Sequence, residues 1–428
     1  MVGNIPRGWR LTTLGDLVCL VRNGTTASQI SEGTPFPVTR IETIADGIIN
    51  RSRVGYLKQP DDKYLLKHGD ILYSHINSLA HIGKIAFFDQ EDVLYHGMNL
   101  MLIRGSSDLV FAKFLFSVLA SEYGRAHARR ECKPAINQVS LAQTQILALP
   151  IMLPPLPEQR RIAAILDAAD EAIRAGERVI AKLRQVKAGA LHDLLTCGVD
   201  AQGRLRNPRA HPEQFKDSPL GRIPREWEIS RIIDISVGGI SNGFFKKPEL
   251  VGSGYTLINV LDLYQDFGID LGLVERVRAS EQEQQKYAVQ AGDCFFTRSS
   301  LNLSGIAHCN IIREVTEPTL FECHLMRVRP NQKMVVPEFV ALWCRSSWAH
   351  RYLMAQAKQV TMTTIAQPDL APMLVPLPSL AEQTRIAAIL DAHDARLRAE
   401  EAAVAKLRQV KAGLMEDLLT GRVRSKAL

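Results

Sequence analysis

Residues Arg161–Ala168 read RIAAILDA, and the same letters return at Arg385–Ala392. The recurrence extends over Glu158–Thr196 and Glu382–Thr420, so the second copy lies 224 positions after the first (382 − 158). An internal repeat of this length indicates two copies of one structural unit, and it restricts the architecture before any local pattern is considered.

The repeated segment has a helical period, because its apolar residues follow alternating steps of four and three, as in the heptads of a coiled coil. About 40 residues of helix at ~1.5 Å per residue form a rod of roughly 60 Å. Neither rod can bury its stripe alone, so we expect the two to pack on each other as an antiparallel coiled coil; two separate amphipathic helices, each on its own domain, are the alternative. Residues expected to be buried, either against the other rod or against a helix of a partner, are Ile165, Leu166, Leu183, Val186, Ile389, Leu390, Leu407 and Val410.

Each rod follows a segment whose sequence differs between the copies, although a few residues at corresponding positions are the same. Loops vary freely over a fixed framework, so this pattern is typical of a scaffold that binds two different targets. The pattern within each segment predicts short strands and loops closed by one helix, at Leu109–Tyr123 and at Pro337–Met354. The shared positions are Trp9, Gly69-Asp70 and Arg104 in the first copy, and Trp227, Gly292-Asp293 and Arg329 in the second.

The expected fold class is α+β, with two globular domains of mixed strands and helices, two long helices and a pseudo-two-fold internal repeat. A chain of 428 residues is long for one hydrophobic core, which supports this division. We predict a first domain at residues 1–155, a long helix at 156–198, a linker and second domain at 199–379, and a second long helix with the C-terminal tail at 380–428.

Composition narrows the class of partner. A net charge of +7 and a sequence pI of about 9.0 favour a nucleic-acid ligand. No apolar run approaches ~18 residues, and the N-terminus lacks the apolar region of a signal peptide. We therefore expect neither a membrane span nor secretion, and we expect the protein to be located in the cytoplasm. Seven cysteines without a C-x-x-C pair are expected to be core thiols of a reducing compartment and not a zinc site.

Catalytic motifs are absent from the sequence. There is no G-x-x-x-x-G-K-[ST] phosphate loop, no G-x-G-x-x-G after a strand, no H-E-x-x-H and no G-x-S-x-G. An Asn-Pro-Pro-aromatic tetrapeptide, which would position a base for methylation, is also missing. We therefore expect a protein without catalytic residues, cofactor or metal.

With this order of variable and repeated parts, the chain resembles the specificity subunit of a type I restriction–modification system. The resemblance covers nearly the whole chain and is sharpest at Leu153–Gln159 with Arg161–Ile162 and at Leu377–Gln383 with Arg385–Ile386. It implies two target-recognition domains that each recognise one half of a split double-stranded DNA sequence, and helices that carry two methyltransferase subunits, which recruit motor-nuclease subunits. A repeat DNA-binding protein without methyltransferase partners and an unrecognised nuclease remain the alternatives.

Candidate DNA contacts are polar or basic loop residues at equivalent places in both copies. Three places qualify: one after an early loop, one after the Gly-Asp turn and one before the proline-rich exit to the rod. Family members often carry Ser-Arg at the second place, where Arg298 fits and His75 departs. The candidates are Arg40, Ser74, His75, Asn77, Lys84, Lys133, Asn137 and Gln138 in the first copy, and Asn259, Arg298, Ser299, Ser300, Asn302, Lys358, Thr361 and Thr363 in the second.

A solvated loop or a phosphate contact is the alternative role for each of these residues, and Lys84 is expected to be a phosphate-contacting or a surface lysine. On the rods, six polar residues are candidates for docking the partner subunits, with a solvated face as the alternative. They are Arg184, Gln185, Lys187, Arg408, Gln409 and Lys411.

Overall fold

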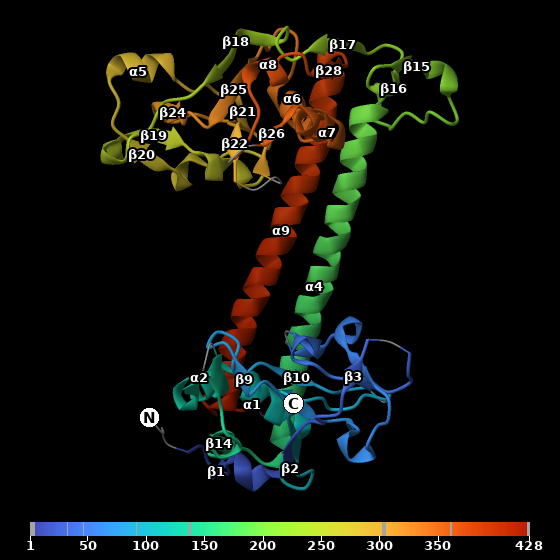
Figure 1. The fold of residues 1–428 in the computed structure, drawn as a ribbon, viewed down its shortest axis with the longest axis vertical. Coiled ribbons are helices and arrows are strands. Elements are labelled where there is room, and N and C mark those ends of the chain that lie inside the picture. The colour runs from blue at the N-terminus through green and yellow to red at the C-terminus, as the bar shows by residue number, and fades with distance from the viewer. Residues whose placement is uncertain are drawn as a thin grey trace. The chain divides into compact units, whose positions relative to one another are not determined.

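The computed structural model describes residues 5–31, 33–45, 47–90, 92–135, 138–301, 305–359 and 362–425. The chain divides into two compact units, Met1–Glu177 with Ala402–Leu428 and Arg178–Glu401. Each unit contains one globular domain and a portion of each long helix, α4 (Leu156–Thr196) and α9 (Leu380–Leu419) (Figure 1). Within the described ranges, no helix is long and apolar enough to cross a membrane.

The domain of the first unit, domain 1, is built on a four-stranded antiparallel sheet in the order β10-β8-β11-β2. Strand β1 pairs with β14, which joins the beginning of the domain to its end. The strands are β1 (Arg10–Thr13), β2 (Val18–Asn23), β3 (Gln29–Ile30), β4 (Pro37–Val38), β5 (Ile44–Ala45), β6 (Ile48–Ile49), β7 (Gly55–Leu57), β8 (Ile71–Tyr73), β9 (Ile76–Asn77), β10 (Ile85–Phe87), β11 (Met101–Gly105), β12 (Lys133–Ala135), β13 (Gln138–Ser140) and β14 (Pro150–Leu153), and the short helices are α1 (Ala112–Ala120), α2 (Glu122–Glu131) and α3 (Gln143–Leu147).

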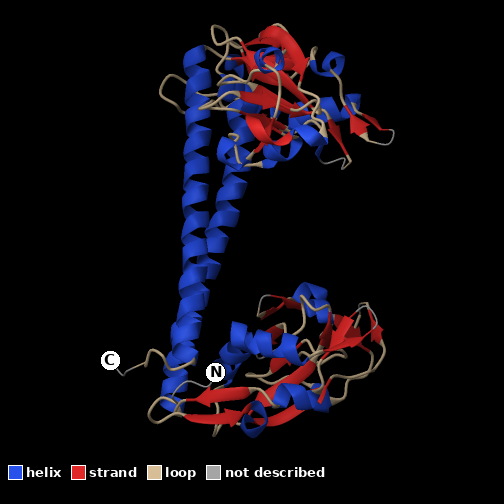
Figure 2. Ribbon diagram, turned by 90° about the vertical axis from the view of Figure 1, so that its left-hand side faces the viewer, coloured by secondary structure: helices blue, strands red, loops and turns tan. Residues whose placement is uncertain are grey.

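Domain 2, in the second unit, repeats this plan with the sheet β23-β21-β25-β18 and the pair β17-β28. Figure 2 shows the mixture of short strands and helices in each domain. The strands are β15 (Phe215–Ser218), β16 (Gly221–Pro224), β17 (Glu228–Arg231), β18 (Ser236–Asn242), β19 (Val251–Ile258), β20 (Glu275–Val277), β21 (Cys294–Thr297), β22 (Ser299–Ser300), β23 (Cys309–Ile311), β24 (Thr319–Phe321), β25 (Leu325–Pro330), β26 (Lys358–Gln359), β27 (Thr363–Thr364) and β28 (Leu374–Leu377), and the short helices are α5 (Glu281–Lys286), α6 (Pro337–Cys344), α7 (Ser347–Gln356) and α8 (Gln367–Leu370).

Two consecutive helices follow the last strand of each four-stranded sheet, where the sequence pattern predicts a single one. Domain 1 has α1 and α2, and domain 2 has α6 and α7. Ser121 and Ser346 separate the helices, because each has an extended backbone and its hydroxyl accepts a hydrogen bond from the N–H three residues later, at Gly124 and Ala349. A serine N-cap starts a new helix at that point, so the prediction of one helix is wrong.

The glutamine of the repeated Glu-Gln pair attaches each long helix to its own domain. Gln159 accepts a hydrogen bond from the N–H of Phe111 (2.7 Å) and donates to the carbonyl oxygen five residues before it (2.9 Å). Gln383 makes the same two bonds, accepting from the N–H of Val336 (2.7 Å). Both side chains are buried. A carboxamide supplies the donor and the acceptor that these buried backbone groups need, which explains why glutamine stands in both copies.

The glutamate of the same pair binds a tryptophan and an arginine. In the first unit, Glu158 accepts hydrogen bonds from the indole nitrogen of Trp9 (3.1 Å) and from the guanidinium of Arg424 (2.9 Å). The hydrogen bonds from Arg424 hold the pKa of the Glu158 carboxyl below its ordinary value, against the opposing effect of burial. The C-terminal tail is thereby tied to the start of α4.

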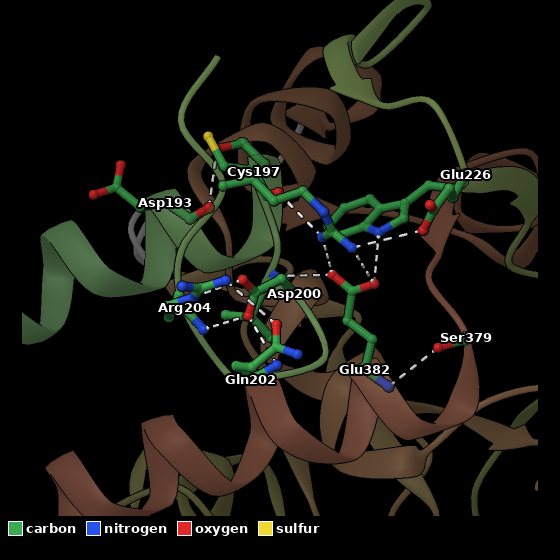
Figure 3. A network of polar contacts seen from close by, with 12 residues as sticks. Asp193, Cys197, Asp200, Gln202, Arg204, Glu226, Ser379 and Glu382 are labelled. Atoms are coloured by element: carbon green, nitrogen blue, oxygen red, sulfur yellow. Dashed lines mark hydrogen bonds and ion pairs between the residues drawn. The ribbon is translucent and has the colours of Figure 1, made fainter. Parts of the chain in front are cut away.

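In the second unit, Glu382 accepts hydrogen bonds from the indole nitrogen of Trp227 (3.2 Å), from Arg206 and from the N–H of Val199 (2.9 Å). Figure 3 shows this network, with Glu382 at its centre. Gly198 has a positive φ of 64°, and a Cβ there would overlap Glu382 and Trp227. The segment that follows α4 therefore has the same role in domain 2 as the C-terminal tail has in domain 1.

Ion pairs join α4 and α9 within each unit, and they obey the repeat. In the first unit, Lys411 binds Asp170 and Arg408 binds Glu177. The second unit has the corresponding pairs, in which Lys187 binds Asp394 and Arg184 binds Glu401. Each residue of the second set differs by 224 from its counterpart, so one pattern of helix contact occurs twice.

Burial along the helices differs in part from the predicted stripe. Leu166 and Leu390 are 2% and 0% exposed, as expected. Ile165, Val186 and Val410 are 39%, 41% and 49% exposed, so their predicted burial against the other rod is wrong, while burial against a partner helix stays a prediction. A strict heptad continues from Leu183 and Leu407 by four residues, which places the two ion-paired lysines on the stripe and turns the preceding valines outward. Leu183, Leu407 and Ile389 are half-buried.

Candidate nucleic-acid interface

A three-stranded sheet in domain 1 brings together the second and third predicted places. Strands β9, β13 and β12 are antiparallel neighbours, with Val139 opposite Asn77 and Lys133 opposite Ser140. Lys133 and Gln138 are exposed. The exposed cation and carboxamide are suited to phosphate and base-edge contacts.

Domain 2 has the equivalent sheet, in the order β22-β27-β26. Ser299 lies opposite Thr364 and Ser300 opposite Thr363, while Lys358 follows on the outer strand and is exposed. Two segments that are about 60 residues apart in the sequence therefore form one surface. The framework places were found from the sequence, but their pairing in one sheet was not.

Buried candidates support this surface. Ser74 and His75 of domain 1 are 1% and 7% exposed, and the Ser74 hydroxyl accepts a hydrogen bond from the Asn77 amide (3.0 Å). Burial lowers the pKa of His75, so its ring is neutral at neutral pH. Ser299 and Thr363 of domain 2 are also buried. These residues are placed to position their exposed neighbours.

Arg298 and Lys84 are half-buried; Arg298 directly precedes β22 of the three-stranded sheet, and Lys84 directly precedes β10. The Arg298 N–H donates to the carbonyl oxygen of His324 (2.8 Å), and its carbonyl oxygen accepts from the N–H of Ile365 (3.0 Å). Neither side chain forms an ion pair within the part of the chain that the structure describes. Both charges are therefore available to a ligand. Asn137, Asn302 and Thr361 lie outside the described residues.

The candidates at the first predicted place, Arg40 in domain 1 and Asn259 in domain 2, each line a hollow. Arg40 contributes to a hollow of about 400 Å³ that is also lined by the loop 25–29 and by Glu42 and Asn99. Asn259 contributes to a hollow of about 380 Å³ in domain 2, together with Lys246, Glu275 and other residues. The sequence indicated Arg40 and Asn259 but neither the hollows nor Lys246.

Shared backbone geometry makes the two hollows equivalent. Gly24 and Gly243 each stand just before the segment that lines the hollow of their own domain. A side chain at either position would place its Cβ against a carbonyl oxygen of the neighbouring chain segment. Arg40 and Asn259 both cap a short 3₁₀ helix, with the cap N–H donating to the side chain three residues later (2.7 Å in each case). The Asn-Gly dipeptide at the end of β2 and again at the end of β18 is a sequence signal for these equivalent loops.

Four of the six predicted partner-docking residues form ion pairs between the long helices, namely Arg184, Lys187, Arg408 and Lys411. The two lysines lie on the stripe that joins the helices, since about a quarter of each lysine side chain is exposed, whereas the arginines are more than 60% exposed. Gln185 and Gln409 are exposed next to them.

All seven cysteines are free thiols. Only Cys294, Cys309 and Cys344 are buried, while Cys19 is exposed and the other three are intermediate, so the prediction that all are core thiols is wrong. Of the described residues, Glu322, Cys323 and His324 form the one group with ligand atoms close enough for a metal ion. Glu322 already accepts the N–H of His324 (2.9 Å), so local backbone geometry accounts for this grouping.

Comparison with known proteins gives a consistent result. A family model described as "Type I restriction modification DNA specificity domain" matches residues 6–185 and 224–409. The putative type I restriction enzyme MjaX specificity subunit of Methanocaldococcus jannaschii is 30% identical over 99% of this chain and 96% of its own length. Two solved structures share the fold: the type I restriction–modification S subunit from M. genitalium (TM-score 0.57, 13% identity, 98% of both chains), and a chain from a study of complex assembly and conformational transition of the type I R-M system (TM-score 0.60, 19% identity, 98% and 100%).

Proposed function

Because the chain belongs to the family of type I restriction–modification DNA specificity subunits, we propose that it recognises a bipartite double-stranded DNA target, with one domain for each half-site. The observation that carries this proposal is the repeat itself. The buried polar anchors are duplicated, while the three-stranded sheets and the hollows carry different side chains. Two recognition surfaces on one framework suit an asymmetric target.

The chain is a recognition subunit, and catalysis in such systems is carried by partner subunits. We propose that two methyltransferase subunits bind the long helices, and that motor-nuclease subunits join through the assembled complex. A DNA-binding repeat protein without methyltransferase partners, or a nuclease, is not supported by the family match. We place the complex in the cytoplasm, with its DNA.

DNA contacts are proposed at the two sheets and the two hollows, with exposed lysines on phosphates and amides and Arg298 on base edges. The set comprises Arg40, Ser74, His75, Asn77, Lys84, Lys133, Asn137 and Gln138, and Asn259, Arg298, Ser299, Ser300, Asn302, Lys358, Thr361 and Thr363. The buried members of this set support their exposed neighbours.

The long helices are proposed to act as an antiparallel coiled coil with pseudo-two-fold symmetry that sets the spacing between the half-sites. Its support is the set of ion pairs that occurs once in each unit. Arg184, Gln185, Arg408 and Gln409 form the exposed positions proposed to dock the partner subunits, and Lys187 and Lys411 border them.

A methylation map tests this function. The chain is co-expressed with its cognate methyltransferase subunit on a plasmid library of random sites, and methylated sites are sequenced. We expect two separate specified blocks with a fixed gap. Insertion of four helical residues within 175–180 adds ~6 Å and is expected to lengthen the gap without altering the bases in either block. A single continuous block, or an insertion that altered the bases, would contradict the proposal.

A further inference from the structure

The hollows of the two domains each contain a cation bonded to a carboxamide. In domain 1 the Arg40 Nε donates to the Gln29 Oε1 (2.7 Å). In domain 2 the Lys246 Nζ donates to the Asn259 Oδ1 (3.0 Å). The equivalent cap positions hold the cation in domain 1 and the carboxamide in domain 2. Each domain thus pairs its cap residue with a side chain from the preceding segment, but the cap residue is the cation in domain 1 and the carboxamide in domain 2.

Each cap residue keeps hydrogen-bonding capacity on its outer side. Within the described ranges, Arg40 uses only its Nε in a side-chain bond, so both terminal nitrogens of the guanidinium can donate to a ligand. The Asn259 Oδ1 accepts from Lys246 and its Nδ2 donates to the carbonyl oxygen of Leu257 (3.2 Å). The oxygen retains a second lone pair, and the second amide hydrogen lies toward the Asp262 carboxylate, where it can be shared with a ligand. Arg40 is therefore a double donor, and Asn259 is a donor and an acceptor side by side.

Charge separates the two hollows further. The hollow of domain 1 has the Arg40 cation with one carboxylate, Glu42, and the hydroxyls of its 25–29 loop. In domain 2, three carboxylates surround one cation, and Lys246 is ion-paired with Glu275. Such a surface repels phosphate and favours a ligand that donates hydrogen bonds. Only the hollow of domain 1 is suited to the edge of a DNA base that carries mainly hydrogen-bond acceptors.

The chain segment from Glu322 to His324 links the hollow of domain 2 to the proposed DNA surface. Glu322 lines the hollow, and the adjacent His324 accepts the Arg298 N–H through its carbonyl oxygen at the start of the three-stranded sheet. A DNA duplex on that sheet would therefore bring a base edge to the hollow.

From these contacts we propose that each hollow receives one base edge, with Arg40 recognising guanine in one half-site and Asn259 recognising adenine in the other. This inference rests on the bipartite recognition proposed above. Guanine presents two acceptors, O6 and N7, to a double donor such as a guanidinium. Adenine presents the N6 amino group beside the N7 acceptor, which matches the remaining donor and acceptor of Asn259. The surrounding carboxylates favour the amino group and disfavour guanine O6.

The test uses the full chain in complex with its methyltransferase subunit and selects bound duplexes from a random library. Arg40→Ala is expected to reduce discrimination for guanine at one position of one half-site by roughly 5- to 150-fold, with every other position unchanged. Asn259→Ala is expected to do the same for adenine in the other half-site. Arg10→Ala, at an exposed residue of the domain 1 framework, and Asn207→Ala, at an exposed linker residue, are the matched controls.

Two conservative variants sharpen the test. Asn259→Asp keeps the shape of the side chain but removes the amide donor, so the preferred base at that position is expected to change from adenine to cytosine, whose N4 amino group donates to a carboxylate. Arg40→Lys keeps the charge and loses the planar pair of donors, so discrimination is expected to fall while the salt dependence of binding stays the same.

Base preferences that are unchanged in Arg40→Ala and Asn259→Ala would overturn the inference, and so would loss of an entire half-site, because that result indicates a structural role for the hollow. Absence of guanine from one wild-type half-site and of adenine from the other would also overturn it. These outcomes leave the bipartite function intact. A wild-type complex that selects no pair of blocks would instead refute the function.

Discussion

Domain 1 and domain 2 agree at the buried polar anchors of their framework and differ at the hollows that are open to a ligand. The Gln159 and Gln383 anchors make the same backbone contacts, and Asp70 and Asp293 bind Arg104 and Arg329 through the same two atoms of each guanidinium. Elsewhere the equivalent cap positions hold Arg40 and Asn259. A buried polar group must keep its partner, because loss of the partner leaves the desolvation cost uncompensated. An exposed one is free to change with the target.

The glutamate networks show a second difference between the units. Arg206 and Glu382 are 13% and 4% exposed, so this pair is closed to water, whereas Arg424 beside Glu158 is 36% exposed. The arginine of the first unit comes from the C-terminal tail, and that of the second from a linker inside the chain. The glutamate–arginine pair is therefore expected to contribute more stability in the second unit, where it is shielded from water, than in the first.

The largest predicted effect is on the closed network. Glu382→Ala removes one partner of a buried ion pair, which costs ~3–5 kcal/mol because the arginine charge stays buried. Glu158→Ala is expected to cost ~1–3 kcal/mol, because water can reach Arg424. Urea unfolding of the full chain, followed by hydrogen exchange around Trp227 and Trp9, measures the two losses separately.

Exposed Glu213 provides the matched control, and Glu213→Ala is expected to leave the free energy of unfolding unchanged within ~0.5 kcal/mol. Equal losses in Glu382→Ala and Glu158→Ala would show that water access does not distinguish the two networks.

The second prediction compares two apolar residues of α9. Leu390 is fully buried in the second unit and Val410 is 49% exposed. Leu390→Ala is expected to lower the free energy of unfolding by ~2–5 kcal/mol through lost burial and a cavity. Val410→Ala is expected to change it by no more than ~0.5 kcal/mol. Thermal unfolding of both variants checks this prediction. A large loss of stability in Val410→Ala would mean that Val410 is buried, as the sequence pattern predicts.

Much of the fold followed from the sequence, because repetition and heptad spacing are global signals. The long helices, the two domains of mixed strands and the separation of framework from surface were all legible. The break at Ser121 and Ser346 was missed, since a serine within an apolar helical pattern becomes a cap only when its backbone is extended. The outward valines are not predicted by the sequence, because the apolar residues step by three at the end of the stripe, from Leu183 to Val186 and from Leu407 to Val410, where the heptad requires four.

The candidate site was predictable in its places and not in its contacts. Equivalent positions in two copies marked Arg40, Asn259 and the segments after the Gly-Asp turn. Pairing of β9 with β13, or of β22 with β27, depends on long-range register that local sequence does not encode. Lys246 escaped notice because its counterpart at the equivalent loop position is Ala27, so the comparison of copies showed no shared polar residue.

The third prediction separates base contacts from phosphate contacts. Arg298→Ala is expected to relax specificity in the half-site of domain 2 alone, by ~1–3 kcal/mol at one position. Lys133→Ala is expected to weaken binding to all sequences uniformly and to reduce the salt slope by about one. Binding titrations of the complex at several salt concentrations check both. A change in both half-sites on Arg298→Ala would refute independent domains.

The smallest expected effect is a dependence of stability on pH in the first unit. The hydrogen bonds from Arg424 lower the pKa of Glu158 below its ordinary value of 4.5. The charged carboxylate therefore stabilises the folded state at any pH above that ordinary value, and this contribution is lost as the pH falls through the lower pKa of the folded protein. Glu158→Gln removes the titrating group, so its stability deficit relative to the wild type is expected to be constant from pH 7 to about pH 5 and to shrink below about pH 4.5. Urea unfolding at stepped pH measures this deficit, with Glu213→Gln as the exposed control. A deficit that grew as the pH fell would mean that the carboxyl is protonated more readily in the folded chain, and that the tail arginine does not hold it charged.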